Sequence, residues 1–265
     1  MVFELLSYSF MQRAALGGIA IALVCSLIGP FLVLRRLSLL GDGLAHVALG
    51  GIALGLLIGV HPVAAALLAT SIGSLVVYRL IRTTRIHGDA ATAIVLSGGV
   101  GVAVVVLGIT RGFTVDLFSY LFGSILALSK ADLALIAVVL VAVVLFVYVY
   151  YRELVFMSFH EDLAELSGVK STLVSSLFAV MTALAVVVSI RAVGVLLVSA
   201  LLVIPALTAL MLAKSFKATM GYSVLVSVCA LLAGIILAFL LNLPPGGLIV
   251  LTLLGIFISV LIAKR

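Results

Sequence analysis

Nine apolar runs, each about 18 to 24 residues long and nearly free of charge, follow one another along this chain. An α-helix needs about 20 apolar residues to cross the roughly 30 Å hydrocarbon core of a bilayer. The chain is therefore predicted to be an all-α, polytopic membrane protein with eight or nine transmembrane helices. The runs lie at 14–34, 39–60, 62–81, 90–109, 131–151, 172–190, 193–213, 220–241 and 246–263.

The segments between these runs are short, which leaves no room for a separate catalytic domain. Residues 1–265 are thus expected to form one transmembrane domain, and 66% hydrophobic against 9% charged residues excludes a water-soluble one. A further apolar run, 113–128, is too short to span and contains Asp116 and Gly123. We expect it to be re-entrant or interfacial.

Lysine and arginine are unequally divided between the two ends of these helices. With the N-terminus outside, eleven lie on the inner side and four on the outer side, as the positive-inside rule requires. A tenth span at 113–128 would change this to seven against eight. The bias accounts for the net charge of +6, so no nucleic acid partner is expected, and it places the C-terminus in the cytoplasm. The inner set is Arg35, Arg36, Arg79, Arg82, Arg85, Arg152, Lys170, Lys214, Lys217, Lys264 and Arg265; the outer set is Arg13, Arg111, Lys130 and Arg191.

Catalytic motifs are missing from the sequence. His160 and Glu161 begin an HExxH pattern, but position 164 is Ala164, and neither GxSxG nor a Walker phosphate loop occurs. The chain is expected not to be an enzyme, not to hydrolyse ATP by itself and not to hold a permanent cofactor.

Two ionisable side chains, Asp42 and His46, lie inside an apolar run, where each costs on the order of 3 kcal/mol on insertion scales. Four residues apart, they share one face of a helix. Carboxylate oxygen and imidazole nitrogen on adjacent turns can bind a divalent cation such as Zn²⁺ or Mn²⁺. The same residues can instead form a private ion pair, or Asp42 can simply start the helix. On the other side, glycines at 51, 55 and 59 predict close approach of another helix.

Three other ionisable residues have no settled role in transport. His61 precedes Pro62 at an outer hairpin, Asp89 is expected to cap the helix that follows it, and Asp116 lies in the short outer run.

One polar stretch, 152–171, is long enough to hold a helix outside the membrane. Phe156, Phe159, Leu163 and Leu166 form an apolar stripe, and Gly168 is placed to end the helix. The wet side carries Glu161, Asp162 and Glu165. Such a helix is a membrane-surface strut or a docking element, and composition alone favours the strut.

Five segments, in this order along the chain, resemble the membrane permease subunit of zinc/manganese-type, that is divalent metal, ABC importers. They are GPFLVLRRLSLLGDGLAHVALGGIALG at 29–55, DLFSYLFGSILALS at 116–129, FHEDLAELSGV at 159–169, GVLLVSALLVIPALTALML at 194–212 and LPPGGLIVLTLLGIF at 243–257. The resemblance implies the type II ABC importer permease fold in a prokaryotic cell (inner) membrane. It also implies a homodimer around a central pathway, cytoplasmic ABC ATPase subunits and an extracytoplasmic metal-binding protein.

The resemblance also implies residue roles. Asp42 and His46 match the family's metal-contacting Asp and His, with Zn²⁺ or Mn²⁺ as the transported ion and Fe²⁺ compatible with the same ligands. A coupling helix at about 159–169 would dock the ATPase, through Phe159, Glu161, Asp162, Glu165 and Gly168. His160, where relatives often have Asp, and the stretch 88–102 depart from the family pattern, so no role is carried over to Asp89.

Two other functions fit the residues. A self-powered secondary carrier, coupled to metal or protons, would use Asp42 and His46 as a proton relay. A purely structural membrane subunit would tolerate apolar replacements at both positions.

Overall fold

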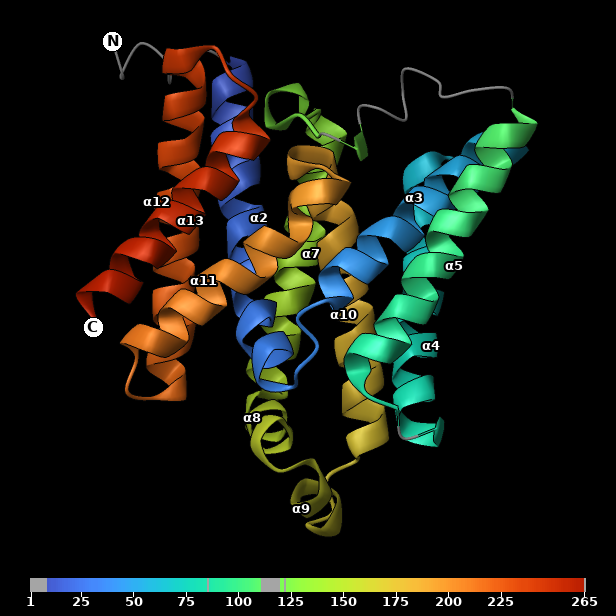
Figure 1. Cartoon of the computed structure of the whole chain (residues 1–265), viewed down its shortest axis with the longest axis vertical. Coiled ribbons are helices and arrows are strands. Elements are labelled where there is room, and N and C mark those ends of the chain that lie inside the picture. The colour runs from blue at the N-terminus through green and yellow to red at the C-terminus, as the bar shows by residue number, and fades with distance from the viewer. Residues whose placement is uncertain (1–8, 85, 111–119, 122, 265) are drawn as a thin grey trace.

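The computed structural model describes residues 9–84, 86–110, 120–121 and 123–264. Helices account for all the regular structure of this part of the chain (Figure 1). They are α2 (Ser9–Leu34), α3 (Leu40–Ile58), α4 (Pro62–Thr84), α5 (Gly88–Ile109), the 3₁₀ helix η1 (Ile125–Ala127), α7 (Lys130–Val149), α8 (Tyr151–Phe159), α9 (Glu161–Leu166), α10 (Ser171–Val193), the 3₁₀ helix η2 (Val195–Leu197), α11 (Val198–Leu212), α12 (Phe216–Leu241) and α13 (Pro245–Ala263).

Within the described ranges, eight helices are long and apolar enough to cross a membrane, which confirms the predicted all-α class. The run predicted at 193–213 is not one continuous helix of full spanning length. Helix α10 continues to Val193, Gly194 breaks it with a φ of 90°, and η2 follows before α11 begins. The 15 residues of α11 reach only about 22 Å. Helix α11 is therefore shorter than the bilayer core.

One end of the bundle gathers the segments predicted to be cytoplasmic. Arg35, after α2, donates to Ser158 of α8, and Arg82, at the end of α4, donates to Glu165 of α9. Helix α9 lies at the lower extremity of Figure 1. We call this end of the bundle the basal end.

Helices α3, α4 and α5 form one packed group because glycines let their backbones approach closely. A Cβ atom at Gly50 would lie 2.7 Å from the Gly99 carbonyl oxygen of α5, and one at Gly51 would lie 2.8 Å from Ala69 of α4. The predicted close approach is confirmed for Gly51 and Gly55, which both face α4. Gly59 instead ends α3, with a φ of 73°.

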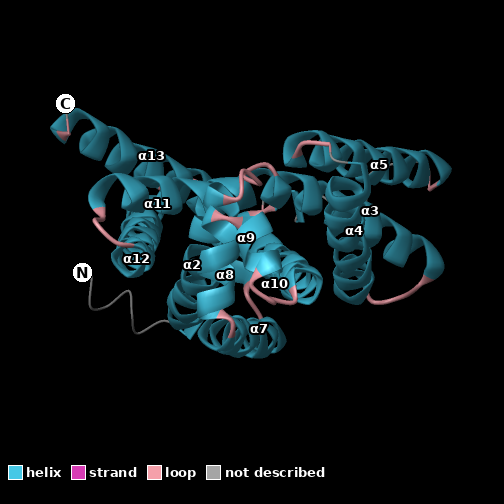
Figure 2. Cartoon of the chain, turned by 90° about the horizontal axis from the view of Figure 1, so that it is seen from below, coloured by secondary structure: helices cyan, strands magenta, loops and turns pink. Residues whose placement is uncertain are grey.

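The remaining long helices form a second group around the buried α2, with α7, α11 and α12 against it and α13 against α11 and α12. Helix α10 lies between the two groups (Figure 2). It packs on α4 and α3 on one side and on α2 and α7 on the other. The seam between the groups holds both of the sites described below.

The short outer run contributes no span within the described residues. Its described part contains η1, whose buried Ile125 lies against Gly18 of α2. Arg191 of α10 links this run to α7 and α10: it donates to the Tyr120 hydroxyl at 3.0 Å and to Asp132 of α7 at 2.9 Å. Asp116 lies outside the described residues.

Candidate functional site

Asp42 and His46 lie on adjacent turns at the start of α3, with 3.8 Å between Asp42 Oδ1 and His46 Nε2. This separation exceeds hydrogen-bonding distance. Asp42 accepts one weak hydrogen bond from Ser199 Oγ at 3.4 Å, and His46 Nδ1 is buried without a hydrogen-bond partner in the described part of the chain. The two side chains are therefore not locked into a saturated ion pair.

The helix start does not by itself explain Asp42. Leu39 is the N-cap residue of α3, with no side-chain cap, and Asp42 lies in the first turn. A carboxylate there is favoured by the helix dipole, typically by about 0.3–1 kcal/mol, which offsets only part of its insertion cost.

The pair opens to the surface of the single chain between two helices. Gly43 and Gly50 of α3 pack on α5, Gly41 packs on α11, and Asp42 and His46 occupy the sector between them. Their side chains are 36% and 22% exposed. Both groups can therefore still accept a ligand.

Among the described residues, no third His, Cys, Asp or Glu completes a metal-binding cluster. His61 is exposed in the segment between α3 and α4. Asp89 is exposed in the first turn of α5, where His87 is the N-cap residue, so the prediction that Asp89 caps this helix is wrong. The described part of one chain thus brings together two strong ligands, and divalent metals require more.

At the basal end, the predicted single amphipathic helix is two helices. The helix is interrupted at His160, which has a non-helical backbone with a φ of −147° and lies between α8 and α9. The apolar stripe is therefore divided between the two helices. Gly168 ends α9 as predicted: at a φ of 86° it donates to the Glu165 carbonyl, and Val169 donates to that of Ala164. This pair of bonds is the Schellman motif, which needs a left-handed residue.

The outer surface of α9 is exposed: Leu166 is 85% exposed, beside the exposed acids Glu161 and Asp162. Phe159, the last residue of α8, is 56% exposed and packs edge-on against Phe216 of α12. Figure 1 shows that α9 projects beyond the ends of the spans. An apolar surface with an acidic margin, held away from the bundle, suits a docking element better than a strut lying on lipid.

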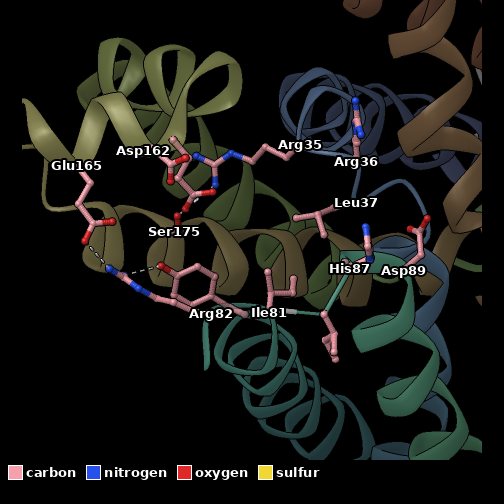
Figure 3. A pocket seen from close by; sticks show the side chains of 14 residues that line it. Arg35, Arg36, Leu37, Ile81, Arg82, His87, Asp89, Asp162, Glu165 and Ser175 are labelled. Carbon is pink, nitrogen blue, oxygen red and sulfur yellow. Dashed lines mark hydrogen bonds and ion pairs between the residues drawn. The ribbon is translucent and has the colours of Figure 1, made fainter. Parts of the chain in front are cut away.

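Glu165 is instead engaged within the chain (Figure 3). Its carboxylate accepts from Arg82 at 2.8 Å and from the Ser171 hydroxyl at 3.1 Å. Arg82 also donates to Tyr78 at 3.1 Å and to Thr172. These contacts tie α9 and the start of α10 to the end of α4.

The Arg82–Glu165 pair borders a cavity of about 600 Å³ at the seam between the two helix groups, which we call the basal cavity. Arg35 lines its other side, donating to Ser158 at 3.4 Å and to Ser175 at 3.3 Å, with its guanidinium 5.0 Å from the Phe178 ring centre. Burial lowers the pKa of Arg35, and the Glu161 carboxylate opposes that shift. Arg35, which follows α2, therefore contacts α8, and Arg82 of α4 contacts α9.

Sequence reasoning missed Ser199, Arg82 and Arg35 as site residues. Both arginines were counted only as inner charges, and the 83 positions between Arg82 and Glu165 carry no periodic signal that would pair them. Ser199 is one hydroxyl among several in apolar helices. Its one sequence signal is its place in the segment 194–212, which carries part of the family resemblance.

Comparison with known proteins agrees with this architecture. The model of the ABC 3 transport family matches residues 7–264. The manganese import system permease protein ScaB of Streptococcus parasanguinis is 32% identical over 97% of this chain and 92% of its own, and the high-affinity zinc uptake system membrane protein ZnuB of Haemophilus influenzae is 29% identical over 97% and 99%.

Among solved structures, PsaBC from Streptococcus pneumoniae, in complex with Fab, superimposes with a TM-score of 0.86. The alignment is 28% identical and covers 98% of this chain and 95% of that one. Family pattern, spans and three-dimensional fold agree along almost the entire sequence, and the chain belongs to the ABC 3 transport family.

Proposed function

We propose that this chain is the membrane permease subunit of an ATP-driven importer of zinc or manganese ions. The observation that carries the proposal is the Asp42–His46 pair, one turn apart, not hydrogen-bonded to each other and open to the surface. Relatives whose names state manganese import or zinc uptake support this ion class. Fe²⁺ accepts the same ligands.

A second copy of the chain would complete the ligand set. Two copies facing each other across the opening between α5 and α11 would bring together two carboxylates and two imidazoles. Four oxygen and nitrogen ligands suit zinc, and manganese accepts them with added water. The pathway would then run along the junction of the two subunits, in the prokaryotic cell membrane.

Energy would come from a separate ATPase subunit that contacts α9 at the basal end. The chain carries no phosphate-binding loop, and Glu161 and Asp162 offer exposed acids for such a partner. In this arrangement the basal end is cytoplasmic and the N-terminus lies outside, where an extracytoplasmic binding protein would deliver metal. A self-powered carrier is less well supported, because the chain belongs to the ABC 3 transport family and ABC transporters work with ATPase subunits.

Reconstitution tests the proposed function. Vesicles containing this chain, its cognate ATPase and binding protein should take up radioactive zinc or manganese only when ATP is supplied on the ATPase side. Vesicles without ATPase but with a proton gradient serve as the control. Uptake in that control would favour the secondary carrier.

The Arg82–Glu165 pair is expected to couple movement of α9 to α4. Both side chains are exposed, 37% and 55%, and an exposed pair contributes at most about 1 kcal/mol to folding, so the fold should survive its loss. Arg82→Glu would set two acids together, and we expect metal transported per ATP hydrolysed to fall roughly fivefold. The charge swap Arg82→Glu with Glu165→Arg should restore most of that ratio. Equal coupling ratios in all three proteins would refute this role.

A further inference from the structure

A second concave surface at the basal end shares no lining residue with the basal cavity and includes neither Asp42 nor His46. It is a groove of about 570 Å³ running along α2 between α7 and α12. Leu27 of α2 with Val144 and Val147 of α7 lines its apolar part, and Arg152 of α8 and Lys217 of α12 line its basal rim. Figure 2 shows these four helices side by side on the face opposite α5 and α13.

The apolar part of this groove lies on the exposed outer side of the spanning helix α7. Val144 is 45% exposed and Tyr148, which also lines the groove, is 82% exposed, both near the basal end of the spanning helix α7. Tyrosine favours the boundary between hydrocarbon and headgroups. An acyl chain can therefore enter the groove directly from the membrane.

The rim is positive and uncompensated. Among the described residues, no acid lines the groove, and neither Arg152 nor Lys217 forms an ion pair. Glu153, next to Arg152 in the chain, is not part of the lining. Lys217 lies in the first turn of α12, where the helix dipole disfavours positive charge. An anion between them would satisfy both side chains.

We propose that this groove binds an anionic phospholipid, with its phosphate headgroup between Arg152 and Lys217 and an acyl chain against Leu27, Val144 and Val147. Clustered basic residues between spanning helices at the membrane surface are typical of such sites. The bound lipid joins α12 to the α7–α8 junction. This inference does not depend on the proposed metal transport.

The absence of tryptophan from the chain permits a clean test. Tyr148→Trp places a single fluorophore in the groove of the full-length protein, reconstituted in vesicles with acyl-brominated lipids that quench it. Brominated phosphatidylglycerol should be preferred over brominated phosphatidylcholine by roughly fivefold for each cation. At Leu251→Trp, an exposed position on α13 outside the groove, the two lipids should quench equally.

Paired variants then assign the preference to the rim. Arg152→Gln with Lys217→Gln should abolish it, and the conservative Arg152→Lys with Lys217→Arg should keep it. Lys170→Gln with Lys214→Gln removes the same charge from the same end outside the groove and should leave it unchanged. Equal quenching by both lipids at Tyr148→Trp, or equal loss in the Lys170 and Lys214 variant, would overturn the proposal. So would loss of all lipid quenching when the ATPase subunit is added, because the groove would then belong to that partner.

Discussion

Replacing Asp42 by Ala should reduce ATP-dependent zinc or manganese uptake to background, a loss at least on the order of 100-fold. Changes to residues that only orient a metal ligand cost 10–100-fold, and removal of a ligand itself should cost no less. In a homodimer the substitution would remove two carboxylate ligands from the shared site, one from each copy. The measurement is initial uptake rate in reconstituted vesicles, normalised to the complex recovered by size exclusion.

Two further variants separate metal binding from a structural part for Asp42. Asp42→Asn keeps the shape of the side chain and the acceptor for Ser199, so the fold is preserved, but an amide oxygen is a weaker ligand and uptake should still fall. Glu153→Ala is the matched control, since it removes a first-turn carboxylate of α8 that lies outside both sites. Normal uptake by Asp42→Asn, or equal losses in the Asp42 and Glu153 variants, would contradict the site assignment.

Reversing the two exposed acids of α9, Glu161→Arg with Asp162→Arg, should detach the ATPase. Unpairing a charge at a buried interface typically costs 2–5 kcal/mol, so affinity should fall by at least about 30-fold even if only one acid is paired. Co-purification of the ATPase with tagged permease measures the loss, and uptake should disappear with it.

The matched control for docking is Glu153→Arg. Glu153 lies on α8, outside α9 and outside the lining of the basal cavity, so its reversal should leave the complex intact. The Arg82→Glu protein should also keep its ATPase while transporting less metal for each ATP. Wild-type recovery of ATPase with the doubly reversed α9 would show that docking lies elsewhere.

Hydropathy predicted the spans because it measures how favourably a segment moves from water into the hydrocarbon core. It failed at 193–213 because the residues on both sides of Gly194 are equally apolar, and the break is a backbone conformation that hydropathy does not record. Periodicity failed at His160 for a similar reason: Phe159 and Leu163 keep helical spacing although the chain turns between them.

The candidate site was predictable to the extent that it is local. Asp42 and His46 are four residues apart, so helical geometry alone brings them together. Ser199, which meets Asp42 from 157 positions away, and Arg82, which takes Glu165 away from the docking surface, come together only through tertiary packing. Such long-range contacts leave no local pattern in a single sequence.

The shortness of α11 bears on how the protein is made. A helix of about 22 Å cannot hold both of its ends at the two surfaces of a bilayer, so neighbouring helices must fix its depth. Two of these neighbours are α2 and α12, and α12 is synthesised after α11. Because Ser199 lies 157 positions after Asp42, the contact between them can form only once Ser199 has been synthesised, when all of α3 already exists.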